Sequence, residues 1–143
     1  MNRISILLAD DHRFVRKAFR TILENEADLE VVGEAKNGPE AVALAKRLHP
    51  ALVLMDVTMP LLNGVQATRQ ILDANPCTRV LMLSIHNDEM YVRESINSGA
   101  MGYLLKQTCA PIICTAIREV NKGNMFFSPS VPSHLQKRNE QTK

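Results

Sequence analysis

Five short apolar runs alternate with amphipathic stretches along the chain. The runs are nearly continuous in aliphatic residues, as in parallel strands that are buried on both faces. They lie at residues 4–9, 29–35, 51–55, 80–83 and 103–105. Repeated β–α units of this kind favour right-handed crossovers onto one parallel sheet. The pattern therefore predicts an α/β fold with a doubly wound, five-stranded parallel sheet.

The stretches between these runs have the spacing and the end signals of helices. Apolar residues from Phe14 to Leu23 repeat at helical spacing, which predicts a first helix packed on the sheet through these residues. Pro39 stands at the tolerated N-terminal position of a second helix, and a third follows the third apolar run. A fourth is predicted at about residues 88–98, and Thr108 is the predicted N-cap of a fifth.

The chain changes character from Ser128 onward. Proline and serine alternate there, and the residues that follow are polar, with too little periodic apolar content for another packed element. We therefore predict one domain over residues 1–127 and a linker or disordered tail over residues 128–143.

Composition restricts the class of protein. A chain of 143 residues with a 45% hydrophobic share is typical of one soluble globular domain. No stretch approaches the roughly 18 uninterrupted apolar residues of a membrane helix, and no signal-peptide pattern opens the chain. We expect a cytoplasmic protein without a membrane partner. Cys77, Cys109 and Cys114 are odd in number and lack metal-site spacing, which favours reduced thiols.

The small positive charge is concentrated at one end of the chain. The net charge is +2, and Lys137, Arg138 and Lys143 against Glu140 account for all of it. The remaining residues are balanced and provide no overall basic field for nucleic acid. We therefore expect no specific DNA binding by this domain itself.

Polar residues follow four of the five apolar runs. Asp10 and Asp11 follow the first run, Asp56 the third, Ser84 the fourth and Lys106 the fifth. Because the carboxyl ends of parallel strands meet at one edge of a sheet, these side chains should converge on one pocket. Clustered carboxylates are costly unless they surround an ion. An acidic pocket with one lysine predicts a site for a divalent cation and a phosphoryl group.

These positions resemble the receiver domain of two-component response regulators. The family has an acidic pair after its first strand, a phosphorylated Asp after the third, Ser or Thr after the fourth and Lys after the fifth. Asp56-Val-Thr-Met-Pro60 followed by Gly64 also matches the family's D-x-x-M-P-x-x-x-G segment. The resemblance covers about residues 5–129, and residues 99–106 and 123–129 are similar to the NarL/FixJ (LuxR-type) subfamily.

The resemblance implies a flavodoxin-like sheet with strand order 2-1-3-4-5 and a metal-assisted phosphoryl site. Asp56 would be the phosphorylated nucleophile, receiving its phosphoryl group from a sensor histidine kinase. Asp10, Asp11 and Asp56, with the backbone carbonyl of Thr58, would hold Mg²⁺ or Mn²⁺.

The same resemblance assigns roles to three further residues. Lys106 would contact an oxygen of the phosphoryl group, and the Ser84 hydroxyl would donate to another. Tyr103 would be the switch residue that turns inward when Ser84 is drawn toward the phosphate.

The implied output is a changed binding surface rather than a turnover reaction. The chain would be a phosphoacceptor that assists its own phosphorylation and dephosphorylation, not an enzyme with a separate substrate. Members of the subfamily usually continue into a helix-turn-helix domain that controls transcription, and they pair their receivers when phosphorylated. We expect DNA contact only through such a C-terminal domain, whose pattern this sequence lacks. A stand-alone receiver that signals to another protein is the alternative.

Other functions fit the sequence less well. A phosphatase of the haloacid dehalogenase type also uses a strand-end aspartate, but its D-x-D motif is missing because Thr58 stands where the second acid belongs. An inert pseudo-receiver would not need the complete set of acids and lysine. His12 and His86 flank the expected site, and we predict local hydrogen bonds for both rather than metal binding. Ile85 is bulkier than the small residue usual in the family and could narrow access to the site.

Overall fold

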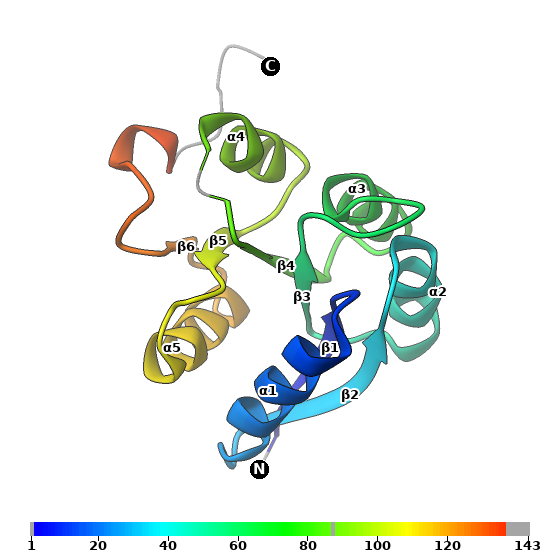
Figure 1. Cartoon of the computed structure of the whole chain (residues 1–143). Coiled ribbons are helices and arrows are strands. Elements are labelled where there is room, and N and C mark those ends of the chain that lie inside the picture. The colour runs from blue at the N-terminus through cyan, green and yellow to red at the C-terminus, as the bar shows by residue number, and fades with distance from the viewer. Residues whose placement is uncertain (1, 87, 137–143) are drawn as a thin grey trace.

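A parallel six-stranded sheet forms the centre of the computed structural model, which describes residues 2–86 and 88–136 (Figure 1). Its strand order is β2-β1-β3-β4-β5-β6. The strands are β1 (Ile4–Ala9), β2 (Leu29–Ala35), β3 (Leu52–Asp56), β4 (Arg79–Ser84), β5 (Gly102–Leu105) and β6 (Phe126–Phe127). The helices are α1 (Arg13–Glu24), α2 (Gly38–Leu48), α3 (Gly64–Ala74), α4 (Glu89–Asn97) and α5 (Ala110–Asn121), followed by the 3₁₀ turn η1 (Ser133–Leu135).

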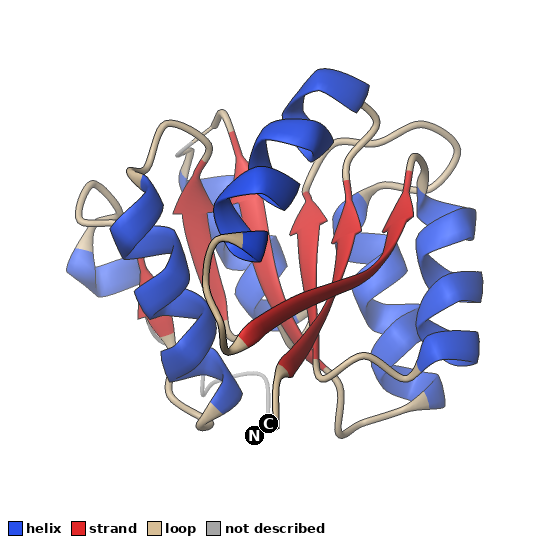
Figure 2. Ribbon diagram, turned by 90° about the horizontal axis from the view of Figure 1, so that it is seen from below, coloured by secondary structure: helices blue, strands red, loops and turns tan. Residues whose placement is uncertain are grey.

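Helices cover both faces of the sheet, as Figure 2 shows. Buried residues of α1 and α5 form one apolar core with alternate strand residues, and those of α2, α3 and α4 form the other. This arrangement confirms the predicted doubly wound α/β fold and the order 2-1-3-4-5 of its first five strands. The central strands β3 and β4 are buried on both faces, which explains why they appear in the sequence as continuous apolar runs.

The first helix buries a narrower face than the sequence predicts. Phe19 and Leu23 are buried, but Phe14 is 87% exposed. At roughly 100° per residue, Phe14 falls on the opposite side of the helix from Phe19 and Leu23. The expectation that Phe14 packs on the sheet is therefore wrong.

Local hydrogen bonds fix the starts of two helices. The Asn37 side chain accepts a hydrogen bond from the Glu40 amide at 2.8 Å at the start of α2. Asn63 and Gln66 form a reciprocal capping box at the start of α3. The N-cap of α5 is Cys109 rather than the predicted Thr108, because the Thr108 hydroxyl instead lies 3.0 Å from the Ser128 hydroxyl.

A sixth strand extends the sheet beyond the predicted five. In β6, Phe126 and Phe127 pair in parallel with Gly102 and Tyr103 of β5. The approach is close, because a Cβ atom at Gly102 would lie 2.1 Å from the Phe126 carbonyl oxygen. A strand of two residues has no period of its own, so the local sequence gave no signal for it.

The segment after β6 packs against the domain as far as it is described. Val131 and Leu135 are both 2% exposed and belong to the core beneath α4. Figure 1 shows η1 beside α4. The expectation of no packed element after Ser128 is thus wrong for residues 128–136, because two apolar residues suffice where α4 and β5 leave a surface for them. Residues 137–143 of the predicted tail lie outside the described residues.

None of the described helices has the length and hydropathy needed to cross a membrane.

Candidate functional site

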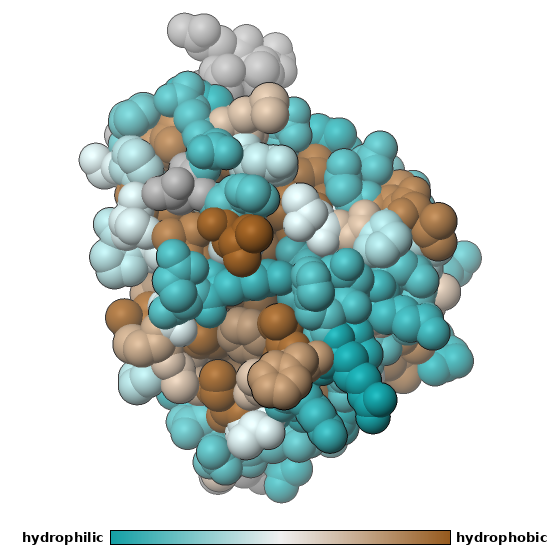
Figure 3. Space-filling model, viewed as in Figure 1, coloured by the Kyte–Doolittle hydropathy of each residue, from teal (hydrophilic) through white to brown (hydrophobic). Residues whose placement is uncertain are grey.

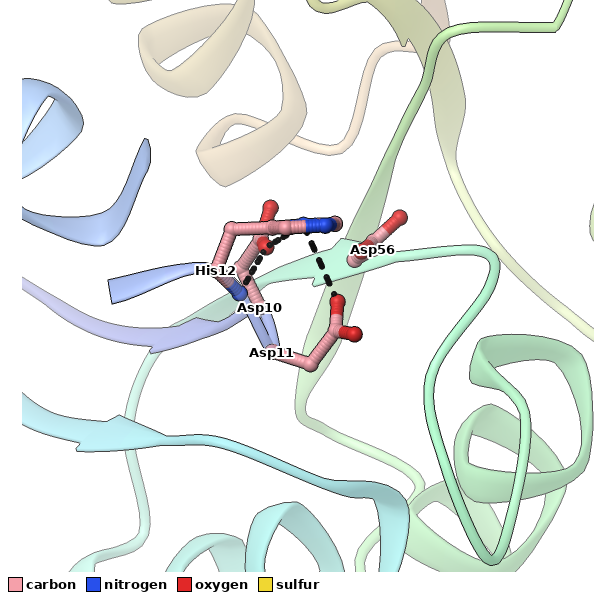
Figure 4. A group of neighbouring side chains, drawn as sticks. All are labelled: Asp10, Asp11, His12 and Asp56. Carbon is pink, nitrogen blue, oxygen red and sulfur yellow. Dashed lines mark hydrogen bonds and ion pairs between the residues drawn. The ribbon is translucent and has the colours of Figure 1, made fainter. Parts of the chain in front are cut away.

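The parallel register brings four strand ends together. Ala9 pairs with Met55, so the residues that follow β1 lie beside the end of β3. Ser84 at the end of β4 pairs with Leu105, so Lys106 emerges next to it. Asp10, Asp11 and Asp56 therefore gather at the carboxyl edge of the sheet, as the sequence predicts (Figure 4).

Asp56 is the most enclosed carboxylate of the group, with 1% of its surface exposed. Its Oδ1 accepts a hydrogen bond from the Thr58 amide at 3.3 Å. The loop after Asp56 is pressed against it, because a Cβ atom at Gly64 would lie 2.1 Å from the Asp56 carbonyl oxygen. Only glycine fits at position 64, which gives a physical reason for the glycine in the motif.

Lys106 lies between two buried carboxylates. Its Nζ is 2.8 Å from Asp10 Oδ2 and 3.2 Å from Asp56 Oδ2. Both distances are those of ion pairs, although the ammonium group is not oriented for good hydrogen bonds to either oxygen. The lysine thus compensates the acids from within the pocket.

Burial and neighbouring charges shift the ionisation of this group. Burial, followed by the negative charge of Asp10, raises the pKa of Asp56 from 3.8 to about 6, against the opposing effect of Lys106. Burial lowers the pKa of Lys106, but contact with Asp10 and the charge of Asp56 outweigh it and leave this pKa above its usual value. At neutral pH the site holds an ionised Asp56 against a charged Lys106.

The acidic group fits a divalent cation. Ligand atoms of Asp10, Asp11, His12 and Asp56 lie within 4.8 Å of one another. One oxygen of each aspartate is buried and accepts no hydrogen bond from the described residues. Buried carboxylates are costly when one lysine balances only part of their charge, and hard oxygen ligands are those that Mg²⁺ and Mn²⁺ prefer. These residues are therefore suited to hold such an ion.

The histidine beside the acids makes local contacts, as predicted. His12 Nδ1 lies 3.1 Å from Asp10 Oδ1 and 3.1 Å from Asp11 Oδ1, and the His12 amide donates to Asp10 Oδ1 at 2.8 Å (Figure 4). The side chain of Thr58 is exposed, and the metal-ligand role of its carbonyl stays a prediction.

Ser84 and Tyr103 are linked through His86, which makes the local hydrogen bonds predicted for it. The Ser84 hydroxyl accepts a hydrogen bond from the His86 amide at 2.9 Å, and the Tyr103 hydroxyl donates to the His86 carbonyl. Tyr103 is fully buried, and burial raises its pKa to about 12. The His86 ring also stacks on Tyr91 of α4, with ring centroids 4.9 Å apart. His86 therefore joins Ser84 to Tyr103 through its backbone and contacts α4 through its ring, a role that no local sequence signal reveals.

Known proteins are similar to this chain over most of its length. The model of the response regulator receiver domain family matches residues 6–118. The transcriptional regulatory protein DegU of Brevibacillus brevis is 40% identical over 136 residues, which cover 95% of this chain and 58% of DegU. The response regulator protein VraR of Staphylococcus aureus is 38% identical over 135 residues, which cover 94% of this chain and 65% of VraR.

A solved structure is similar over nearly the whole chain. It is the crystal structure of a LuxR-family two-component response regulator from Aurantimonas sp. SI85-9A1, with a TM-score of 0.87 and 31% identity. The match covers 91% of this chain and 93% of that one. By contrast, the chain spans only 58% and 65% of the lengths of DegU and VraR.

Proposed function

Since the chain belongs to the response regulator receiver domain family, we propose that it accepts a phosphoryl group from a sensor histidine kinase on Asp56. The observation that carries this proposal is the pocket itself. A buried Asp56 faces a largely enclosed lysine and two further carboxylates, and the single lysine cannot balance the charge of three acids. Such a pocket is stabilised when a cation and a phosphoryl group enter it.

The proposed reaction is a phosphoryl transfer between two side chains. An Asp56 carboxylate oxygen attacks the phosphorus in line, the new P–O bond forms, and the P–N bond to the kinase histidine breaks. Asp10, Asp11 and Asp56, with the Thr58 carbonyl, would hold Mg²⁺ or Mn²⁺. The ion would neutralise charge on the phosphoryl oxygens. Lys106 is already 3.2 Å from Asp56 and would follow the charge onto the phosphoryl group.

The chain's own hydrogen bonds suggest how the signal leaves the site. The Ser84 hydroxyl would turn from the His86 amide toward a phosphoryl oxygen, which frees that amide. Tyr103 donates to the carbonyl of the same residue, so the loop before α4 would adjust with it. In this proposal Tyr103 and α4 form the element that responds to phosphorylation.

We infer that the kinase docks on the carboxyl-end face of the sheet. Phe14, Leu61, Ile85 and Met90 are large hydrophobic residues that are 62% to 87% exposed, and each follows the end of a strand that borders the pocket. Figure 3 views this face and shows hydrophobic side chains among hydrophilic ones. The exposed Ile85 side chain lies at this surface, where an apolar partner could cover it.

The output that we propose is transcription regulation through a C-terminal DNA-binding domain. DegU is a transcriptional regulator by name, and this chain spans only part of its length. The chain would act in the cytoplasm as a phosphoacceptor and not as a turnover enzyme.

Phosphoramidate with Mg²⁺ should add one phosphoryl group to the protein, because the donor supplies the energy and the pocket supplies the charges. A metal chelator should prevent the reaction, and hydroxylamine should remove the group, since it attacks acyl phosphates. Intact-mass spectrometry measures all three effects. A folded protein that gains no mass with Mg²⁺ present would contradict the proposed phosphoacceptor role.

Phosphorylation should also favour a homodimer, and of the α1–α5 and α4–β5–α5 surfaces we propose the first as its contact face. The α1–α5 side has an open cleft of about 340 Å³ that includes Pro111 and Thr115. Binding of a second copy there would bury this cleft.

Sedimentation velocity with and without beryllofluoride tests the dimer. Thr115→Glu on α5 should prevent the shift to dimer, and Met90→Glu on α4 should not. The opposite pattern would place the dimer on the α4 side, and a monomer in both states would favour a receiver that signals to a different protein.

A further inference from the structure

Arg16 connects the acidic strand end to the neighbouring strand. It lies near the start of α1, with 14% of its side chain exposed. Its Nη1 donates a 2.6 Å hydrogen bond to the backbone carbonyl of Asp10, and its Nε donates a 3.0 Å bond to Glu34 Oε1 on β2. One planar side chain therefore joins the start of the helix, the residue after β1 and the end region of β2.

The connector that carries the acidic pair is short. Only Asp10, Asp11 and His12 separate β1 from α1, and the side chain of His12, the N-cap residue, contacts the Asp10 carboxylate instead of capping the helix. The Asp10 amide donates to the Ala35 carbonyl at 3.0 Å, which holds one side of that residue. The bond from Arg16 holds the other side, so the Asp10 backbone is fixed at both its N–H and its C=O.

Glu34 sets the direction of the Arg16 side chain. Arg20 shares this carboxylate, with Nη1 2.6 Å from Glu34 Oε2, but among the described residues Arg20 makes its other ion pair with Glu24. Burial raises the pKa of Glu34, but the hydrogen bonds from Arg20 and Arg16 outweigh this effect and lower it overall. Glu34 thus remains an anion, and its hydrogen bond to Nε orients the Arg16 guanidinium toward the Asp10 carbonyl.

We propose that Arg16 is a positioning residue for the divalent-cation site. By holding the Asp10 carbonyl, it fixes the short connector and presents the carboxylates of Asp10 and Asp11 at the separation that the ion requires. Arg16 reaches the ion only through these acids. The inference rests on the proposed function, because it concerns the same pocket.

Three variants separate positioning from general stability. Arg16→Met keeps the aliphatic packing and loses both hydrogen bonds. Arg20→Met is the matched control, since it also loses a bond to Glu34 but none to Asp10. Arg16→Lys keeps a cation that can reach the Asp10 carbonyl and should recover much of the lost function.

Calorimetric titration with Mg²⁺ alone, without any phosphodonor, measures the effect directly. Arg16→Met should bind Mg²⁺ roughly tenfold more weakly, as expected when a residue that orients a metal ligand is lost. Arg20→Met should stay within about twofold of wild type, and Arg16→Lys should lie between wild type and Arg16→Met. Thermal unfolding, followed by circular dichroism, identifies a temperature at which all variants are folded, and the titrations are carried out at that temperature.

A second readout distinguishes positioning from damage to the whole pocket. The phosphoramidate reaction of Arg16→Met should need more Mg²⁺ for half its maximal rate but reach a maximal rate close to that of wild type. Wild-type Mg²⁺ affinity in folded Arg16→Met, or an equal loss in Arg20→Met, overturns the inference. If the wild-type protein itself binds no Mg²⁺, the proposed function fails and not only the role of Arg16.

Discussion

Asp56→Asn should abolish phosphorylation and, at the same time, make the metal-free fold more stable. The amide cannot serve as the nucleophile, so phosphoramidate should add no phosphoryl group to the variant. The gain in stability follows from burial, because the wild-type protein must keep an ionised carboxylate at a position that is 1% exposed and beside Asp10. A neutral amide of nearly the same shape avoids the free-energy cost of burying that charge.

The pH dependence of this effect has a definite sign. The pKa of Asp56 is about 6 in the folded protein against an ordinary 3.8, so between these values the folded state holds a proton that the unfolded chain releases. Wild-type stability should therefore fall as pH rises from about 4 to about 6. Above that window the full cost is present, about 3 kcal/mol. Below it, the protonated Asp56 should resemble the asparagine of the variant.

Urea unfolding at several pH values, together with intact-mass measurement of labelling, tests both parts. Asp73→Asn is a suitable control, because Asp73 is an exposed residue of α3. It should keep the wild-type labelling and the wild-type pH profile. Undiminished labelling of Asp56→Asn would mean that another residue accepts the phosphoryl group. An Asp56→Asn variant that is less stable than wild type at neutral pH would show that burial of this carboxylate is fully compensated.

Lys106→Met should have the opposite effect on stability. In the wild-type protein two buried carboxylates share one ammonium group, at 2.8 and 3.2 Å. Methionine keeps the apolar part of the lysine side chain but removes its positive charge. Breaking a buried ion pair from one side costs about 3 to 5 kcal/mol. The loss should grow as pH rises through the pKa of Asp56, since protonated acids do not repel each other.

Divalent cation should reverse part of this loss. Mg²⁺ binds the folded protein only, and it can replace the missing positive charge, so it should raise the stability of Lys106→Met more than that of wild type. Urea unfolding with and without Mg²⁺ measures the difference. Lys122→Met is the control, because the Lys122 side chain is 66% exposed and should change stability little. Equal stability of Lys106→Met and Lys122→Met would show that Lys106 does not compensate the acids.

The sequence by itself determined the sheet and the residues at its carboxyl edge. Strands that are buried on both faces must be short and apolar, so each strand end is marked by the first polar residue, as at Asp10, Asp56 and Lys106. Parallel strands then bring these ends to one edge whatever the details of packing. This is why the location of the pocket could be predicted from spacing and residue type alone.

Only the tertiary structure decided which partners these residues have. Strand spacing does not reveal that Lys106 contacts both Asp10 and Asp56, or that His86 joins Ser84 to Tyr103 through its backbone. Long side chains and loop amides have several possible partners, and the choice depends on elements far apart in the chain.

The same reason explains β6, the packing of residues 128–136 and the role inferred for Arg16. Phe126 pairs with β5 only because Gly102 leaves room for its carbonyl, and Leu135 is buried only because α4 lies above it. Arg16 reaches Asp10 because Glu34, on another strand, aims its guanidinium. Local patterns specify elements, whereas contacts between distant elements exist only once the chain has folded and their entropic cost has been met.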